Sequence, residues 1–146
     1  MNFYLKSFVE LTTTELYEIL RVREEIFMME LGMHCRDLDG VDLLATHCFL
    51  MQDGSILAYL RAFPEQEDPA AIHIGRVLTC THGKGHGRAL MTQAISALAE
   101  KFSCKRIVAH AQVQAAPFYE KLGFSIVSEP YLEEGVPHVS IERTLP

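Results

Sequence analysis

The segment from Ala71 to Phe102 limits the fold more than any other part of the chain. It opens with a β-branched, mostly apolar run, AIHIGRVLTC, which predicts a central strand over 71–80. Three glycines follow at alternate positions in GKGHG, and GRALMTQAISALAEKF then predicts a helix over 87–102. The apolar face of this helix consists of Leu90, Ala94, Ile95 and Leu98. A strand that passes through a glycine-rich turn into such a helix is typical of α/β sheet proteins.

The rest of the chain alternates strand and helix patterns without an internal repeat. The complete order is β-α-β-β-β-α-β-α-β-β, with further strands expected over 3–11, 47–52, 56–63, 106–111, 124–128 and 136–145 and helices over 15–32 and 115–122. Thr12 and Glu15 have the spacing of a capping box, and Asp53-Gly54-Ser55 is a hairpin signal. A chain of 146 residues with this order is expected to form one α/β domain, residues 1–146.

Composition excludes several classes of protein. Hydrophobic residues make up 49% and charged residues 22%, which is typical of a folded chain rather than a disordered one. Thirteen basic residues against 19 acidic ones give a net charge of −6, so general attraction to nucleic acid or an anionic membrane is not expected. No signal peptide or membrane span is evident, which favours the cytoplasm.

The cysteines do not form a recognisable framework. Cys35, Cys48, Cys80 and Cys104 lie 13 to 32 residues apart and include no CxxC pair. Ordinary buried or half-buried thiols are therefore expected, rather than zinc ligands or disulfides.

The glycine-rich loop has the chemistry of an anion site. Unpaired N–H groups and the positive end of the helix dipole gather at a helix N-terminus, and glycines let the backbone approach a ligand closely. Lys84 and Arg88 add positive charge. The spacing is neither GxxxxGK[ST] nor GxGxxG, so a Walker loop or a dinucleotide site is not indicated. The alternative to an anion site is a turn in which the glycines only allow the chain to bend.

Two sequence patterns could suggest a metal site, and neither meets all the requirements of such a site. His82 and His86 have i,i+4 spacing, but the glycines between them argue against a helix there, and no further ligand is near, so no metal is expected. The sequence DLDGVD (37–42) lacks the register of a calcium-binding EF-hand loop. A tight turn with an Asx cap is the expected structure.

Two motifs together resemble those of the GCN5-related N-acetyltransferase (GNAT) superfamily. HGKGHG (82–87) matches the family's [Q/R]xxGx[G/A] loop with His82 at the Arg or Gln position, and QVQAAPFYEKLGF (112–124) matches NxxAxxFYxxxGF with Gln112 in place of Asn. Thr79 stands where a proline usually precedes the loop, and the segment from Arg76 to the loop is about two residues short. Members of this family have a bulge in the strand before the loop, and both departures concern the local geometry of that bulge.

The resemblance extends to the small ElaA-like subgroup and covers nearly the whole chain. It is carried by the N-terminal residues Arg23, Phe27 and Glu30, by DLDGVD, and by YLEEGVPH (131–138). It implies a mixed, mostly antiparallel sheet that is splayed between its central strands and flanked by helices.

The resemblance also implies acetyl-CoA as co-substrate and an N-acetyltransferase that works by direct transfer to an amine. The residues expected to bind the cofactor are Val77, Leu78, Thr79, His82, Gly83, Lys84, Gly85, His86, Gly87, Arg88 and Gln112. Val77–Thr79 would pair with the pantetheine arm as a pseudo-strand, and the pyrophosphate would lie over the loop. Tyr119 is expected to protonate the departing thiolate, although an aromatic residue beside Phe118 could simply pack.

The remaining roles stay open. His73 and His138 are candidates for the general base, while Glu30, Arg23 and Arg61 could shape the acceptor pocket. Arg21 is expected on a solvated helix face. The acceptor is expected to be a small-molecule or peptide amine, with no nucleic acid or membrane partner and a possible homodimer. The alternatives are a catalytically inactive CoA-binding sensor and a plain interaction protein.

Overall fold

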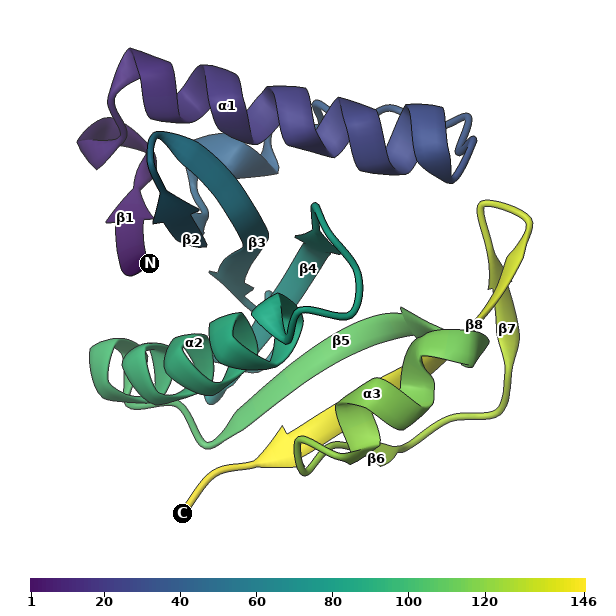
Figure 1. Ribbon diagram of the computed structural model, residues 1–146. Helices are drawn as coiled ribbons and strands as arrows, with labels where there is room; N and C mark the ends of the chain where they lie inside the picture. The colour runs from purple at the N-terminus through teal and green to yellow at the C-terminus, as the bar shows by residue number, and fades with distance from the viewer.

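The computed structural model describes all residues, 1–146, as an eight-stranded sheet with helices on both faces (Figure 1). The strands are β1 (Asn2–Ser7), β2 (Thr46–Gln52), β3 (Ser55–Pro64), β4 (Ala71–Thr79), β5 (Arg106–Gln112), β6 (Ser125–Ile126), β7 (Tyr131–Glu133) and β8 (Val136–Thr144). The helices are α1 (Thr13–Arg23), α2 (His86–Phe102) and α3 (Ala116–Glu120). The order in the sheet is β1-β2-β3-β4-β5-β8-β6, with β7 pairing to β8. The expected mixed, mostly antiparallel α/β sheet is confirmed, because only β4 and β5 run parallel.

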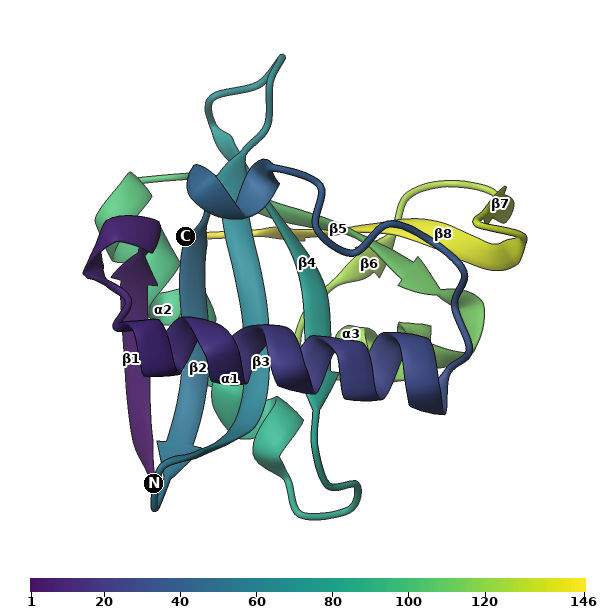
Figure 2. The same cartoon turned by 90° about the horizontal axis from the view of Figure 1, so that it is seen from above.

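The two faces of the sheet have separate cores. Beneath the sheet in Figure 1, α2 packs Leu90, Met91 and Leu98 against β2–β5 in a cluster of 21 buried residues. On the other face, Ile19 and Val22 of α1 and Ile26, which follows it, pack on Phe49 and Tyr59 in a cluster of seven. Figure 2 shows α1 crossing above β1–β4, whereas β5 and β8 turn away from those strands. None of the helices is both long and apolar enough to cross a membrane.

A bulge in β4 accounts for this splay. Between Tyr59 and Arg61 the register of β3 against β4 shifts by one residue, and Arg76 has a positive φ of 51° at that point. Before the bulge, β4 pairs with β5 over Ala71–His73; after it, β4 stays with β3 alone. The predicted splay between central strands is therefore confirmed, and the bulge forms although Thr79 replaces the usual proline.

Three arginines and three aspartates tie α1 to the bulge. Arg23, whose side chain is fully buried, donates to Asp42 at 2.7 Å and to Asp37 at 3.1 Å. Arg76 donates from Nε to the other Asp37 oxygen at 3.0 Å. Arg61 binds Asp39 at 2.6 Å and shares Asp42. The predicted Asx turn is confirmed, since the Val41 N–H donates to Asp39 Oδ1.

The ion pairs hold Arg23 and Asp39 in their ionised forms. Although burial by itself lowers the pKa of Arg23, its carboxylate partners and Tyr59 raise that pKa above the usual value. Hydrogen bonding to Arg61 lowers the pKa of Asp39 to about 2. Behind the network, Tyr59 donates to His47 Nδ1 at 2.7 Å while His47 Nε2 donates to the Asp42 carbonyl at 3.0 Å. Burial lowers the pKa of His47, so the imidazole is neutral at neutral pH and carries its proton on Nε2.

Several predicted boundaries were wrong for local reasons. The strand expected over 3–11 ends at Ser7, because Ser7 and Glu10 cap a turn of 3₁₀ helix over Phe8–Glu10. The helix expected over 115–122 is a 3₁₀ turn (Val113–Ala115) followed by α3, and the strand over 124–128 keeps only Ser125–Ile126. The helix expected over 15–32 begins earlier, at Thr13, with its predicted capping box at Thr12.

Two elements were not predicted from the sequence. The first is a π-helical segment, Glu24–Glu30, which continues α1 without a break and closes with the Leu31 N–H donating to Ile26 at 2.9 Å. The second is β7, which forms a tight hairpin with β8.

Removing the buried guanidinium should be far more damaging than removing an exposed one on the same helix. Arg23→Met removes the fully buried partner of both Asp37 and Asp42. It leaves Asp42 to Arg61 and Asp37 to Arg76, so we expect a loss of about 3–5 kcal/mol in the free energy of unfolding. Arg21→Met is the control, because Arg21 pairs only with Glu18 on an exposed face, and we expect less than about 1 kcal/mol. Urea denaturation measures both, and equal losses would contradict the network's role.

The low pKa of Asp39 predicts a defined acid sensitivity. Because its folded pKa of about 2 lies below the ordinary value of 3.8, its contribution to stability is complete above that value and is lost as the pH falls toward 2. Asp39→Asn keeps the Asx acceptor but not the charge. The stability gap between native protein and variant, measured by urea denaturation, should shrink between about pH 5 and pH 2. A gap independent of pH would be inconsistent with this assignment.

Candidate functional site

The splay leaves one edge of β4 without a partner strand. The Cys80 N–H donates to Leu57 of β3 at 2.9 Å. Because donors alternate along an antiparallel strand, the N–H groups of Thr79 and Val77 face the opposite edge, which β5 has left. This edge is an open template for an extended ligand.

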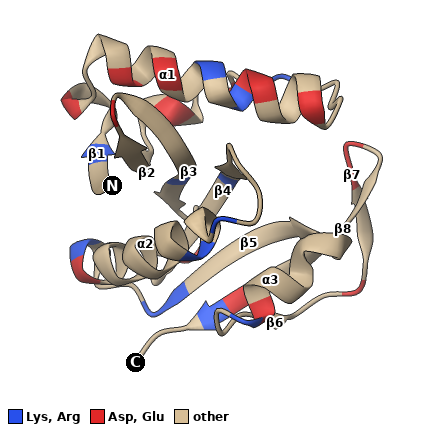
Figure 3. Cartoon of the chain, in the orientation of Figure 1, with Lys and Arg blue, Asp and Glu red and all other residues tan.

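A cavity of about 410 Å³ lies between this edge, the glycine loop and α3. Its lining residues include nine from the predicted cofactor set, namely Val77, Leu78, Thr79, His82, Gly83, Gly85, His86, Gly87 and Arg88. Lys84 does not line it, and Gln112 lines the second cavity instead. Basic residues mark the start of α2 in Figure 3, where the unpaired N–H groups of a long helix also point.

The three loop glycines serve two different purposes. Gly83 and Gly85 have positive φ values of 77° and 75°, and a Cβ at either position would meet open space. Gly87 is helical, and its Cβ would lie 3.2 Å from Thr79 Cγ2 and 3.3 Å from the Phe118 ring. The first two allow the loop to curl, whereas the third lets α2 approach β4 and α3 closely.

His82 does not fold over the loop. Its Nε2 donates instead to Glu30 at 3.0 Å, which joins the loop to the end of the π-helical segment. Both side chains are exposed, so this contact contributes little to stability. Glu30, expected near the acceptor pocket, thus lies beside the cofactor loop.

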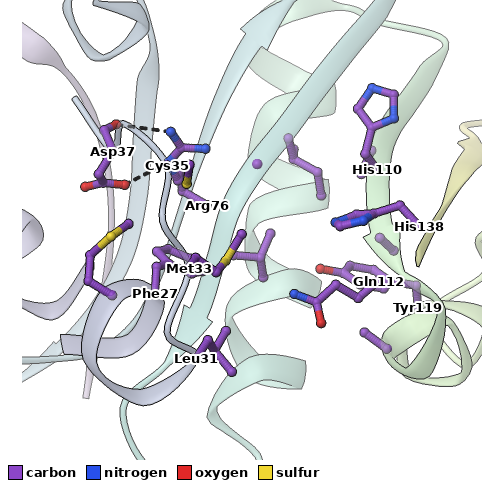
Figure 4. Close-up of a pocket in the computed structure, with 17 residues that line it drawn as sticks. Phe27, Leu31, Met33, Cys35, Asp37, Arg76, His110, Gln112, Tyr119 and His138 are labelled. Carbon is purple, nitrogen blue, oxygen red and sulfur yellow. Dashed lines mark hydrogen bonds and ion pairs between the residues drawn. The ribbon is translucent and has the colours of Figure 1, made fainter. Parts of the chain in front are cut away.

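A second cavity, of about 280 Å³, lies between β4, β5 and the chain that follows α1 (Figure 4). One wall is apolar and comes from the π-helical segment and the chain after it, with Phe27, Met28, Leu31, Met33 and Cys35. The opposite wall carries His110, Gln112, Tyr119 and His138. Asp37 and Arg76, paired with each other, close one end. Arg23 and Arg61 line neither cavity, so placing them in the acceptor pocket was wrong: the aspartates of DLDGVD bind both in the interior.

Tyr119 lines both cavities, as do Val77 and Ala115, and it is the polar side chain among the three. It is 8% exposed and packs edge-to-face on Phe118 and Phe124, at centroid distances of 5.1 and 5.7 Å. Burial raises the pKa of its hydroxyl to about 12, so the phenol keeps its proton at neutral pH. Figure 4 shows the hydroxyl pointing into the second cavity, toward the same space as Gln112 and His138.

The two histidines considered as bases lie in different surroundings. His138 lines the second cavity, and its Nδ1–H donates to the Val136 carbonyl at 2.7 Å. His73 lines neither cavity; it stacks on Phe63 and donates to Glu65 at 2.8 Å. Burial lowers the pKa of His73. The geometry therefore favours His138 as a group that meets a substrate.

His110 was not singled out from the sequence, although a signal was available. It precedes Gln112 by two residues on β5, so the two side chains share a face of the strand. Nowhere do three or more His, Cys, Asp or Glu side chains gather so that they could hold a metal ion. The site consists of a phenol, two imidazoles and the Gln112 amide beside the glycine-rich loop.

The close approach at Gly87 predicts the sign of one substitution. Alanine is favoured over glycine inside helices by about 1 kcal/mol, so Gly87→Ala would stabilise α2 if nothing opposed it. The contacts with Thr79 and Phe118 do oppose it, and we expect a net loss of about 1–3 kcal/mol from overpacking. Adding Thr79→Ser removes the nearer methyl group and should restore part of the loss. Urea denaturation of the single and double variants tests this, and a more stable Gly87→Ala protein would refute it.

Comparison with known proteins agrees with this geometry. The acetyltransferase (GNAT) domain family matches residues 43–145. A UPF0039 protein of Schizosaccharomyces pombe is 36% identical and covers 99% of this chain and 98% of its own. Protein ElaA of Escherichia coli is 30% identical over 92% of this chain and 90% of ElaA.

Solved structures show the same similarity. An acyl-CoA N-acyltransferase from Pseudomonas aeruginosa has a TM-score of 0.90 at 32% identity, covering 98% of this chain and 99% of that one. The crystal structure of Escherichia coli ElaA has a TM-score of 0.89 at 28% identity, covering 97% and 98%. The chain therefore belongs to the GNAT superfamily, in its ElaA-like group, whose fold supports acyl transfer from acyl-CoA.

Proposed function

We propose that this protein is an acetyl-CoA-dependent N-acetyltransferase that transfers the acetyl group directly from the thioester to a small-molecule or peptide amine. One observation carries the proposal. A single buried phenol, Tyr119, lies between a cavity suited to coenzyme A and a cavity suited to an acceptor. Direct transfer requires that arrangement, because both substrates must meet at one proton donor.

The first cavity fits coenzyme A in charge and shape. The loop from Gly83 to Arg88 offers backbone N–H groups, a helix N-terminus and a guanidinium to the pyrophosphate. The open edge at Val77 and Thr79 pairs with the amide groups of the pantetheine arm. An arm lying along β4 brings the thioester to Tyr119, which also lines this cavity.

Tyr119 acts at the departing sulfur. When the amine attacks, the carbonyl carbon becomes tetrahedral and its oxygen negative; the C–S bond then breaks and its electron pair goes to sulfur. The Tyr119 hydroxyl hydrogen-bonds to this sulfur and supplies the proton that yields the thiol. Because its raised pKa keeps the phenol protonated, this donor is present throughout the neutral range.

His138 is the favoured general base. Val136 accepts the Nδ1 proton, which leaves Nε2 of the neutral ring as the nitrogen with a lone pair. The ring lines the acceptor cavity opposite the apolar wall, where the attacking nitrogen would be held. His73 is set aside as a base because it lines neither cavity.

The acceptor cavity favours an amine that carries apolar atoms. The apolar wall can bury hydrocarbon; it consists of Phe27, Met28, Leu31 and Met33. The carboxylate in the lining, Asp37, is already paired with Arg23 and Arg76 and so does not attract a cationic amine strongly. We therefore choose tyramine, spermidine and an unacetylated leucine-rich tripeptide as acceptors for assay.

Coenzyme A should stabilise the protein even without an acceptor. At 100 times its dissociation constant it should add about 2.7 kcal/mol to the free energy of unfolding, visible as a higher melting temperature. Thiol release from acetyl-CoA with the three amines then tests turnover. Stabilisation without thiol release from any amine would favour a CoA-binding sensor, and absence of stabilisation would rule out the proposed cofactor.

Replacing the phenol should lower the rate without weakening cofactor binding. Tyr119→Phe removes only the hydroxyl, so we expect kcat to fall about 100-fold while the affinity for coenzyme A is unchanged. Tyr17→Phe is the matched control, because Tyr17 is 69% exposed on α1. A Tyr119→Phe protein that keeps full turnover would eliminate this residue as the acid.

A further inference from the structure

Apart from His138, the motif YLEEGVPH (131–138) has no role in the proposed reaction. It forms the β7–β8 hairpin, in which Tyr131 lies opposite His138 and Glu133 opposite Val136. The turn consists of Glu134 and Gly135, with φ values of 51° and 76°, as tight two-residue hairpins require. Because alternate residues of a strand share a face, Tyr131 and Glu133 lie on the same side as His138.

The hairpin places a carboxylate next to the accepting nitrogen of the base. Glu133 Oε2 lies 3.4 Å from His138 Nε2, the nitrogen that is free to accept a proton. The His138 side chain is 6% exposed, whereas that of Glu133 is 46% exposed. The carboxylate therefore lies between a buried imidazole and bulk water.

Tyr131 fixes the position of the base. Its ring stacks on the His138 imidazole with a centroid distance of 6.4 Å and an interplanar angle of 25°. Its hydroxyl hydrogen-bonds to His110 Nδ1 and lies 3.2 Å from Ser140 Oγ. One side chain thus holds both imidazoles that border the acceptor cavity.

The chemistry requires a route for a proton. An alkylamine is mostly an ammonium ion at neutral pH, since such groups titrate near pH ~10. The amide product is neutral and the thiol takes one proton, so each turnover starting from the ammonium ion releases one proton net. That proton must leave a largely apolar cavity before the next cycle.

We propose that Glu133 is this exit, receiving the proton from His138 and releasing it to water, with Tyr131 as a positioning residue. The inference rests on the proposed function. The attacking nitrogen forms the N–C bond and gives its proton to the lone pair of His138 Nε2. The imidazolium passes that proton to a Glu133 oxygen, which loses it to solvent and restores the neutral base. The ammonium ion loses its first proton to solvent before attack; Tyr119 supplies the thiol proton separately and is reprotonated from solvent, so one proton is released net in each turnover.

The adjacent glutamates provide a matched pair for the test. Glu133→Gln keeps the shape of the side chain but can no longer accept the proton, whereas Glu134→Gln makes the same charge change in the exposed turn. Turnover is measured with acetyl-CoA and the fastest of the three amines. We expect kcat of Glu133→Gln to fall about 10-fold at an unchanged KM for acetyl-CoA, and Glu134→Gln to behave as the native protein.

Chemical rescue distinguishes proton transfer from a structural effect. Added imidazole, at fixed pH and ionic strength, should restore most of the lost rate of Glu133→Gln because it replaces the missing proton acceptor, and it should not accelerate the native protein or Glu134→Gln. A native kcat in Glu133→Gln, or a loss that imidazole does not relieve, would overturn the inference while leaving the Tyr119 assignment intact. If the native protein releases no thiol with any amine, the proposed function fails and this inference fails with it.

Discussion

The site depends on one strained residue, Arg76, and on the ion pairs that hold it. A positive φ costs a non-glycine residue about 1 kcal/mol or more. Here Arg76 adopts it as part of the bulge, whose extra residue turns β4 away from β5. Asp37 binds the Arg76 guanidinium, and the fully buried Arg23 binds Asp37 in turn. Arg23 is the last residue of α1, so the bulge that splays the sheet is tied to that helix.

The same contacts connect the proposed cofactor cavity with the proposed acceptor cavity. DLDGVD anchors the chain that follows the π-helical segment, so the apolar wall of the acceptor cavity is held by the residues that shape the cofactor edge. On the far wall, Gly87 allows α2 and Phe118 to approach, and Phe118 packs on Tyr119. The Tyr119 ring is thus placed by packing against its aromatic neighbours.

Features with local causes were predictable from the sequence. The capping box at Thr12, the Asx turn in DLDGVD and the helix after the glycine loop each follow from residues a few positions apart. Arg23 and Arg61 were misplaced because their partners lie 14 to 22 residues away, and a sequence does not show which carboxylate a buried arginine will meet. The residue types of the π-helical segment are those of an ordinary α-helix, so the sequence did not predict it. The β7–β8 hairpin, by contrast, had a turn signal in Glu134-Gly135 that was overlooked.

The central claim, that the open edge of β4 binds the pantetheine arm, is tested most directly by amide hydrogen exchange. Exchange is followed by NMR with and without saturating coenzyme A, and the Cys80 amide, already bonded to β3, serves as the internal reference. The account predicts that exchange of the Thr79 and Val77 amides slows markedly when coenzyme A binds, while that of Cys80 changes little. Bound coenzyme A with unaltered exchange at Thr79 and Val77 would contradict it.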